Sequence, residues 1–155
     1  MNDLTRLLAE REIYRQWMLF MQGMDAVFEA NKLGVTPAEC FRQCLTDDFV
    51  AYGKRATPKG IEAYTQMVMQ GAATHFAHWK HVSSNELVQI EQEDKAILVA
   101  YVAAHHLHKS AAVDETNRYE FYTSTAKASF LKSEGIWKMN RLDRSKDDWA
   151  IAYGH

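Results

Sequence analysis

The chain has 155 residues, of which 47% are hydrophobic, and a formal net charge of -2. This length fits one hydrophobic core, so we expect a single domain over residues 1–155. No run of Lys and Arg is long enough to follow a phosphate backbone, which argues against nucleic acid and favours a small molecule or a protein as the partner. Residues 1–25 match neither a signal peptide nor a membrane span, so we expect a cytoplasmic protein without a membrane partner.

The first predicted helix covers residues 4 to about 30. Its apolar side chains recur at the three-and-four spacing of one helical face, and they are Tyr14, Trp17, Met18 and Met21. Asp25 continues the same stripe. A carboxylate on an apolar face is costly unless another group compensates its charge, whereas a carboxylate at an exposed helix end is not. Both interpretations of Asp25 stay open on these residues alone.

The segment TPAECFRQCL predicts a second helix. Thr36 and Glu39 have the spacing of a capping box, with Pro37 at the first helical position. The two cysteines, Cys40 and Cys44, lie on successive turns of this helix, where a disulfide would strain the geometry and constrain little. We therefore expect two reduced, packed thiols.

The remaining elements are a strand, a third helix and a strand meander. A short strand is expected at 47–53, and Thr57 and Pro58 repeat the capping pattern for a helix that ends at Gly71. Four longer strands follow, at 78–91, 95–109, 117–132 and 136–144. Helices followed by a meander indicate an α+β domain, in which helices pack on one face of a curved antiparallel sheet.

Alternation along two of these strands places small residues on one shared face. The residues are Ala96, Leu98, Ala100, Val102, Ala104 and His106 on the first strand, and Tyr122, Ser124, Ala126, Ala128 and Phe130 on the next. Such a face is too thin to fill the space under a helix layer, so it predicts a cavity with a few polar groups. The alternative is that Trp17, Met18 and Met21 fill the gap.

Three histidines, His75, His78 and His81, are spaced three residues apart in HFAHWKH. A zinc site needs three or four converging ligands, and this stretch spans a predicted loop-to-strand junction with no thiolate or carboxylate in the motif, so we expect no metal. A histidine paired with Asp25 would instead provide a general base near neutral pH. Three ordinary surface histidines are the remaining interpretation.

Five segments resemble the nuclear transport factor 2-like superfamily, in the branch with SnoaL-like polyketide cyclases, scytalone dehydratase and hexachlorocyclohexane dehydrochlorinase. They are LTRLLAEREIYRQWMLFMQGMD, LTDDFVAYG, HVSSN, EDKAILVAY and EGIWKMNRL. Their order covers nearly the whole chain. The resemblance implies a cone-shaped α+β fold, with a curved antiparallel sheet against N-terminal helices around an apolar pocket, and a homodimer or homotrimer.

The resemblance also implies site residues. The aspartate that ends the first helix of both enzymes falls on Asp25, and the family's H-x-x-x-N pattern falls on His81 and Asn85, which leaves His75 and His78 as bystanders.

Three more positions carry over from the family. A second dehydratase histidine falls on His106, where a slip of one residue would select His105, and two pocket positions fall on Tyr52 and Ser124.

The chain also departs from both enzymes. Met24 replaces the dehydratase's tyrosine before the aspartate, and Ala126 replaces its pocket asparagine. Phe20 and Leu142 replace the lysine and the arginine of the dehydrochlorinase. Neither enzyme's substrate is therefore implied.

The resemblance implies acid-base chemistry without a metal or cofactor. Asp25 would orient His81 as the base, and His106 or Tyr52 would protonate or hold an oxygen. We therefore expect a dehydratase that acts on a small hydrophobic, cyclic or aromatic molecule, with a cyclase or isomerase as the alternative. Trp17, Tyr101 and Tyr122 suit a ring-containing substrate, although core packing also explains them. A binding or dimerisation module without chemistry is the non-enzymatic alternative.

Overall fold

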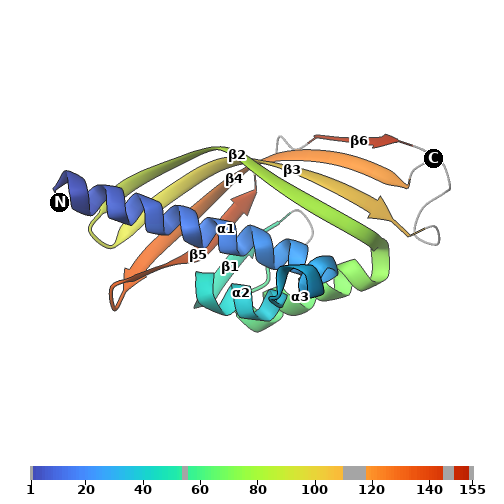
Figure 1. Ribbon diagram of the computed structural model, residues 1–155, viewed down its shortest axis with the longest axis horizontal. Coiled ribbons are helices and arrows are strands. Elements are labelled where there is room, and N and C mark those ends of the chain that lie inside the picture. Colours follow the sequence, from blue (N-terminus) through green and yellow to red (C-terminus); the bar gives the residue numbers. More distant parts are fainter. Residues whose placement is uncertain (1, 54–55, 110–117, 145–148, 154–155) are drawn as a thin grey trace.

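The structure is a computed structural model that describes residues 2–53, 56–109, 118–144 and 149–153, the last range by its backbone only. Figure 1 shows helices gathered on one side of a curved sheet. The elements, in chain order, are α1 (Asp3–Leu33), α2 (Pro37–Cys44), β1 (Leu45–Tyr52), α3 (Ile61–His75), β2 (Phe76–Gln92), β3 (Lys95–His108), β4 (Tyr119–Ser133), β5 (Ile136–Arg144) and β6 (Trp149–Tyr153). The α+β class is confirmed.

The sheet is mixed, which corrects the expectation of a wholly antiparallel one. Its strand order is β1-β5-β4-β3-β2, and β6 pairs with β4. The pairs from β2 to β5 are antiparallel, whereas β1 runs parallel to β5. Because α3 and three long strands separate β1 from β5 in the chain, their pairing is a long crossover, which permits a parallel arrangement.

Helix α1 buries a face that is rotated from the predicted one. Trp17 and Met21 are buried as expected, but Tyr14 and Met18 are 36% and 49% exposed, which corrects their assignment to the core. The positions that complete the buried face are Ile13, Phe20, Met24 and Asp25. Tyr14 and Met18 lie at one edge of the predicted apolar face. A small rotation of that face about the helix axis exposes these two residues and buries Ile13 and Phe20 at the other edge.

Two predicted helix starts had different outcomes. The capping box of α2 is present, since the Thr36 hydroxyl accepts from the Glu39 backbone N–H and the Glu39 carboxylate accepts from the Thr36 backbone N–H. The predicted cap at Thr57 and Pro58 is wrong, because α3 begins after Gly60 and continues past Gly71 to His75. Gly60 has a φ of 85°, so the turn before α3 depends on a glycine rather than on a side-chain cap.

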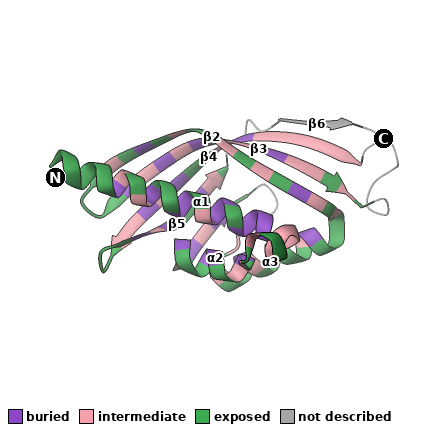
Figure 2. Cartoon of the chain, viewed as in Figure 1, coloured by how far each residue is buried: buried purple, intermediate pink, exposed green. Residues whose placement is uncertain are grey.

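The core lies between the helices and the concave face of the sheet. Figure 2 shows buried segments on the inner side of α1 and along the central strands. Small side chains on β3 and β4, including Ala100 and Ala128, are fully buried, and Trp137 and Phe130 fill the space near them. Cys40 and Cys44 are buried free thiols, as predicted. Of the described helices, none is long and apolar enough to cross a membrane.

Candidate active site

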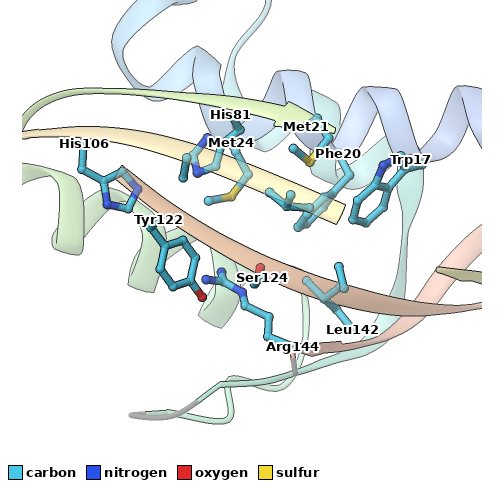
Figure 3. Close-up of a pocket in the computed structure, with 13 residues that line it drawn as sticks. Trp17, Phe20, Met21, Met24, His81, His106, Tyr122, Ser124, Leu142 and Arg144 are labelled. Atoms are coloured by element: carbon cyan, nitrogen blue, oxygen red, sulfur yellow. The ribbon is translucent and has the colours of Figure 1, made fainter. Parts of the chain in front are cut away.

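The small-residue faces of β3 and β4 line a pocket that we call the inner pocket. Its walls come from α1, β2, β3, β4 and β5 (Figure 3). The lining residues are Trp17, Phe20, Met21, Met24, His81, Val102, Ala104, His106, Tyr122, Ser124, Ala126, Leu142 and Arg144. In Figure 3 Trp17, Phe20, Met21 and Leu142 lie toward one end, while His106 and Tyr122 lie toward the other, with Met24 beside His81. The predicted cavity is therefore present.

Asp25 and His81 form a hydrogen-bonded pair beside this pocket. Asp25 Oδ1 lies 2.9 Å from His81 Nδ1 and also accepts from the His81 backbone N–H at 3.0 Å. Asp25 is only 6% exposed. One carboxylate oxygen thus holds both the main chain and the ring of His81, which directs the other ring nitrogen, Nε2, away from Asp25. Of the two interpretations of Asp25, the buried one is confirmed.

Lys80 is a partner of Asp25 that sequence reasoning missed. Its ammonium group lies 3.0 Å from Asp25 Oδ2 and 2.6 Å from Glu29 Oε2. Burial alone would raise the pKa of the Asp25 carboxyl, but hydrogen bonds and charge from His81 and Lys80 outweigh it and lower that pKa below its ordinary value. Asp25 is therefore ionised at neutral pH despite its burial.

His106 is the second histidine of the pocket. Its ring centroid lies 5.9 Å from that of His81, and the Tyr122 ring stacks on it at 6.3 Å. Burial is the main cause that lowers the pKa of His106 to about 4, against the opposing effect of the hydrogen bond that His106 donates to the Glu120 carboxylate. His106 is consequently neutral at pH 7. Its neighbour His105 bonds to the Tyr119 hydroxyl instead and does not line the inner pocket.

The other predicted site residues lie in different places. Ser124 is 9% exposed and Trp17 is 1% exposed, and both line the inner pocket. Tyr101 is 54% exposed and does not line it, because its face of β3 is opposite to that of His106. Asn85 is exposed at an irregularity of β2, where it has a φ of 54°, and does not line the pocket either.

Tyr52 belongs to an adjoining cavity, which we call the outer chamber. Its residues are Ala51, Tyr52, Gly53, Ala56, Pro58, Tyr64, Met67, Phe76, His106, His108, Glu120, Tyr122, Leu142 and Arg144. The chamber and the inner pocket therefore share His106, Tyr122, Leu142 and Arg144. Tyr52 is 41% exposed, and the Arg141 guanidinium lies 4.3 Å from its ring centroid. The tyrosine of the inner pocket is Tyr122.

The three histidines of HFAHWKH point to different neighbours. His81 bonds to Asp25, the His78 ring stacks on Phe28 at 5.5 Å, and His75 ends α3 with its ring 6.2 Å from that of Phe76. These three side chains therefore do not converge as zinc ligands would. Among the described residues, no group of three or more His, Cys, Asp or Glu side chains is arranged to hold a metal ion.

Glu120 and Arg144 are polar groups that sequence reasoning also missed. Alternation contained a signal for Glu120, because it precedes Tyr122 by two residues and therefore lies on the face that carries Tyr122 and Ser124. The same rule places Arg144 on the face of Leu142 on β5. No such signal exists for Lys80, because its contact depends on how β2 packs against α1 near Asp25 and Glu29.

Comparison with known proteins places this chain in a family. The sequence matches the SnoaL-like domain over residues 5–143, and the chain belongs to this family. No curated protein sequence matches it.

Solved structures share the fold at low sequence identity. Hexachlorocyclohexane dehydrochlorinase LinA-type3 from Novosphingobium barchaimii LL02 has a TM-score of 0.81 and 15% identity over 97% of this chain and 94% of that chain. A protein from Novosphingobium aromaticivorans DSM 12444, provisionally assigned as a scytalone dehydratase, has a TM-score of 0.72 and 19% identity over 97% and 91%. The Kfla4162 protein from Kribbella flavida has a TM-score of 0.75 and 12% identity over 92% of each chain. The implied nuclear transport factor 2-like cone is therefore confirmed, and these identities establish the fold alone.

Proposed function

We propose that the protein is a cofactor-independent acid-base enzyme that dehydrates a small hydrophobic, cyclic or aromatic substrate by β-elimination. One observation carries the proposal, namely the buried Asp25–His81 pair at the edge of an apolar pocket, with a 2.9 Å contact between Oδ1 and Nδ1. A buried carboxylate has a cost that a binding pocket alone does not explain. The similarity to a dehydrochlorinase and to a protein assigned as a dehydratase supports this reaction class as an analogy.

The proposed reaction moves one proton within the pocket. Asp25 accepts the Nδ1–H of His81, so Nε2 is the nitrogen that takes the proton from the substrate carbon next to a carbonyl. The same proton then passes from Nε2 to the hydroxyl on the neighbouring carbon, on the same face of the ring. The carbon–oxygen bond breaks, the double bond forms, and water leaves with no net change in protons.

The remaining pocket residues position the substrate in this proposal. Trp17, Phe20 and Leu142 provide an apolar surface for a ring. His106 is held neutral by burial, which lowers its pKa to about 4, so it acts as a hydrogen-bonding group rather than as a cationic acid. Tyr122 and Arg144 line the same cavity and are the groups suited to an oxygen that gains negative charge.

The test uses a simple β-hydroxy ketone. 3-Hydroxycyclohexanone loses water to form cyclohexenone, whose conjugated carbonyl is followed by its ultraviolet absorbance. We expect His81→Gln to reduce the rate by about a hundred- to ten-thousand-fold, while His78→Gln, on the same strand but stacked on Phe28, keeps it. Catalysis that survives His81→Gln would contradict the proposal.

A second assay separates the alternatives. Exchange of the protons next to the carbonyl of cyclohexanone in D₂O reports proton abstraction without elimination. Exchange in the absence of dehydration would favour the cyclase or isomerase alternative. Binding of the ketone with neither reaction would favour a binding module.

A further inference from the structure

A second carboxylate–histidine arrangement lies where the inner pocket meets the outer chamber. Glu120 Oε2 is 3.3 Å from His106 Nδ1 and 3.2 Å from His108 Nε2. Glu120 is the direct cross-strand partner of His106 in the pairing of β4 with β3. Cross-strand partners share one face of a sheet, so this contact follows from the strand register.

The surroundings hold both rings in place. The Phe76 ring lies 4.8 Å from the His106 ring and 4.7 Å from the His108 ring, measured between centroids. The His106 and His108 side chains are each 17% exposed, whereas Glu120 is 29% exposed on the chamber side. The carboxylate therefore faces the chamber, and His106 alone of these three groups also lines the inner pocket.

The contact assigns the two nitrogens of His106. An ionised carboxylate only accepts hydrogen bonds, so the nitrogen beside Glu120 is the one that carries the hydrogen. In a neutral imidazole the other nitrogen is then an acceptor. Since Nδ1 faces Glu120, Nε2 is the acceptor.

We infer that Glu120 is a positioning residue that fixes His106 as the Nδ1–H tautomer, so that the pocket selects ring compounds with a hydroxyl group able to donate to His106 Nε2. The inference rests on the proposed function for the role of this hydroxyl, which would be the departing group. When the hydroxyl donates its hydrogen to His106, its oxygen can still accept the proton that His81 transfers, and the two histidine ring centroids lie 5.9 Å apart. No covalent change occurs at His106.

The tautomer is measured on the full ¹⁵N-labelled chain by long-range proton–nitrogen NMR, with the His106 signals assigned from His106→Gln. We expect hydrogen at Nδ1 in the wild type, a shift toward the Nε2–H form in Glu120→Ala, and recovery in Glu120→Gln, whose amide oxygen still accepts. Glu91→Ala, an exposed glutamate on β2, is the matched control. An Nε2–H tautomer in the wild type would overturn the inference. If Glu120→Ala does not fold, the wild-type spectrum alone still tests the inference.

Ligand preference is measured with phenol and toluene, which differ in shape only slightly but of which phenol alone donates a hydrogen bond. We expect Glu120→Ala to weaken phenol binding about fivefold and to leave toluene binding unchanged, as for one neutral hydrogen bond. Equal changes for both compounds would overturn the preference for a hydroxyl. Neither measurement requires turnover. If the protein shows the expected tautomer and the expected loss of phenol binding but does not catalyse dehydration, the proposed function is contradicted and this inference stands.

Discussion

Two carboxylate–histidine pairs meet at the inner pocket, and they are held differently. The Asp25 side chain is 8% exposed, and its oxygens accept from the His81 ring, the His81 backbone N–H and the Lys80 ammonium within 3.0 Å. Glu120 is 29% exposed and lies 3.3 Å from His106. The first pair is fixed from several directions and suits proton removal from carbon, which needs accurate placement. The second is looser and suits recognition of a hydroxyl.

The largest expected difference between the pairs concerns catalysis. Asp25→Asn removes the charge that orients His81 and stabilises its protonated ring, so we expect dehydration of 3-hydroxycyclohexanone to slow by about a hundred- to ten-thousand-fold. Glu120→Gln should slow it by less than about tenfold, because its amide oxygen still accepts from His106. Equal losses in the two variants would remove the distinction between the pairs.

The next effect concerns stability at acidic pH. The pKa of His106 falls from 6.5 to about 4 on folding, mainly through burial, while Glu120 opposes the shift and His81 and His108 add to it. Between these values the unfolded chain binds a proton that the native protein does not, so stability falls as the pH drops from 6.5 to 4, by up to about 3 kcal/mol. His106→Gln should flatten this part of the curve, measured by urea unfolding at several pH values. A curve like the wild type's would show that another group is responsible.

A smaller effect is expected at Lys80. Its removal in Lys80→Met takes one donor and one positive charge from Asp25, so the pKa of that carboxyl should rise, as followed by carbon NMR of the carboxylate. Because that pKa is lowered in the native state, the stability contribution is present above the unfolded value and is lost as the pH falls through the native one. Lys80 is 46% exposed, so the loss at neutral pH should be at most about 1 kcal/mol. Lys127→Met, on an exposed position of β4, is the control, and an unmoved Asp25 titration would contradict the contact.

The smallest effects are expected at the two remaining histidines of HFAHWKH. His78 is 45% exposed and lies 3.8 Å from Glu29, and His75 is exposed at the end of α3. Either residue changed to Ala should alter the unfolding free energy by less than about 0.5 kcal/mol and leave dehydration unchanged. A clear loss of activity in either variant would extend the site beyond His81.

Sequence reasoning succeeded where the relevant pattern is local. The spacing from Trp17 to Asp25 placed Asp25 on the apolar stripe of α1 but left its burial open, and alternation placed His106, Tyr122 and Ser124 on the face that lines the pocket. Both depend only on the period of a helix or a strand. The same alternation could have identified Glu120.

It failed where the structure depends on packing between distant segments. The parallel pairing of β1 with β5, the strand β6 and the start of α3 at Gly60 have no local pattern that requires them. Lys80 reaches Asp25 because β2 packs against α1 around Asp25 and Glu29, and Tyr52 lines the outer chamber from the last residue of the edge strand β1. Such positions follow from the assembled cone rather than from the elements.

The role of Asp25 as the group that orients the base is tested most directly by the ring nitrogen spectrum of His81 in the wild type and in Asp25→Ala. We predict that His81 carries its hydrogen on Nδ1 at neutral pH, hydrogen-bonded to Asp25, with Nε2 free of hydrogen. We also predict that Asp25→Ala, which removes the acceptor, disturbs this pattern while the His106 signals keep theirs. The same His81 spectrum in both proteins would mean that Asp25 does not set the state of this ring, and the proposed base would be lost.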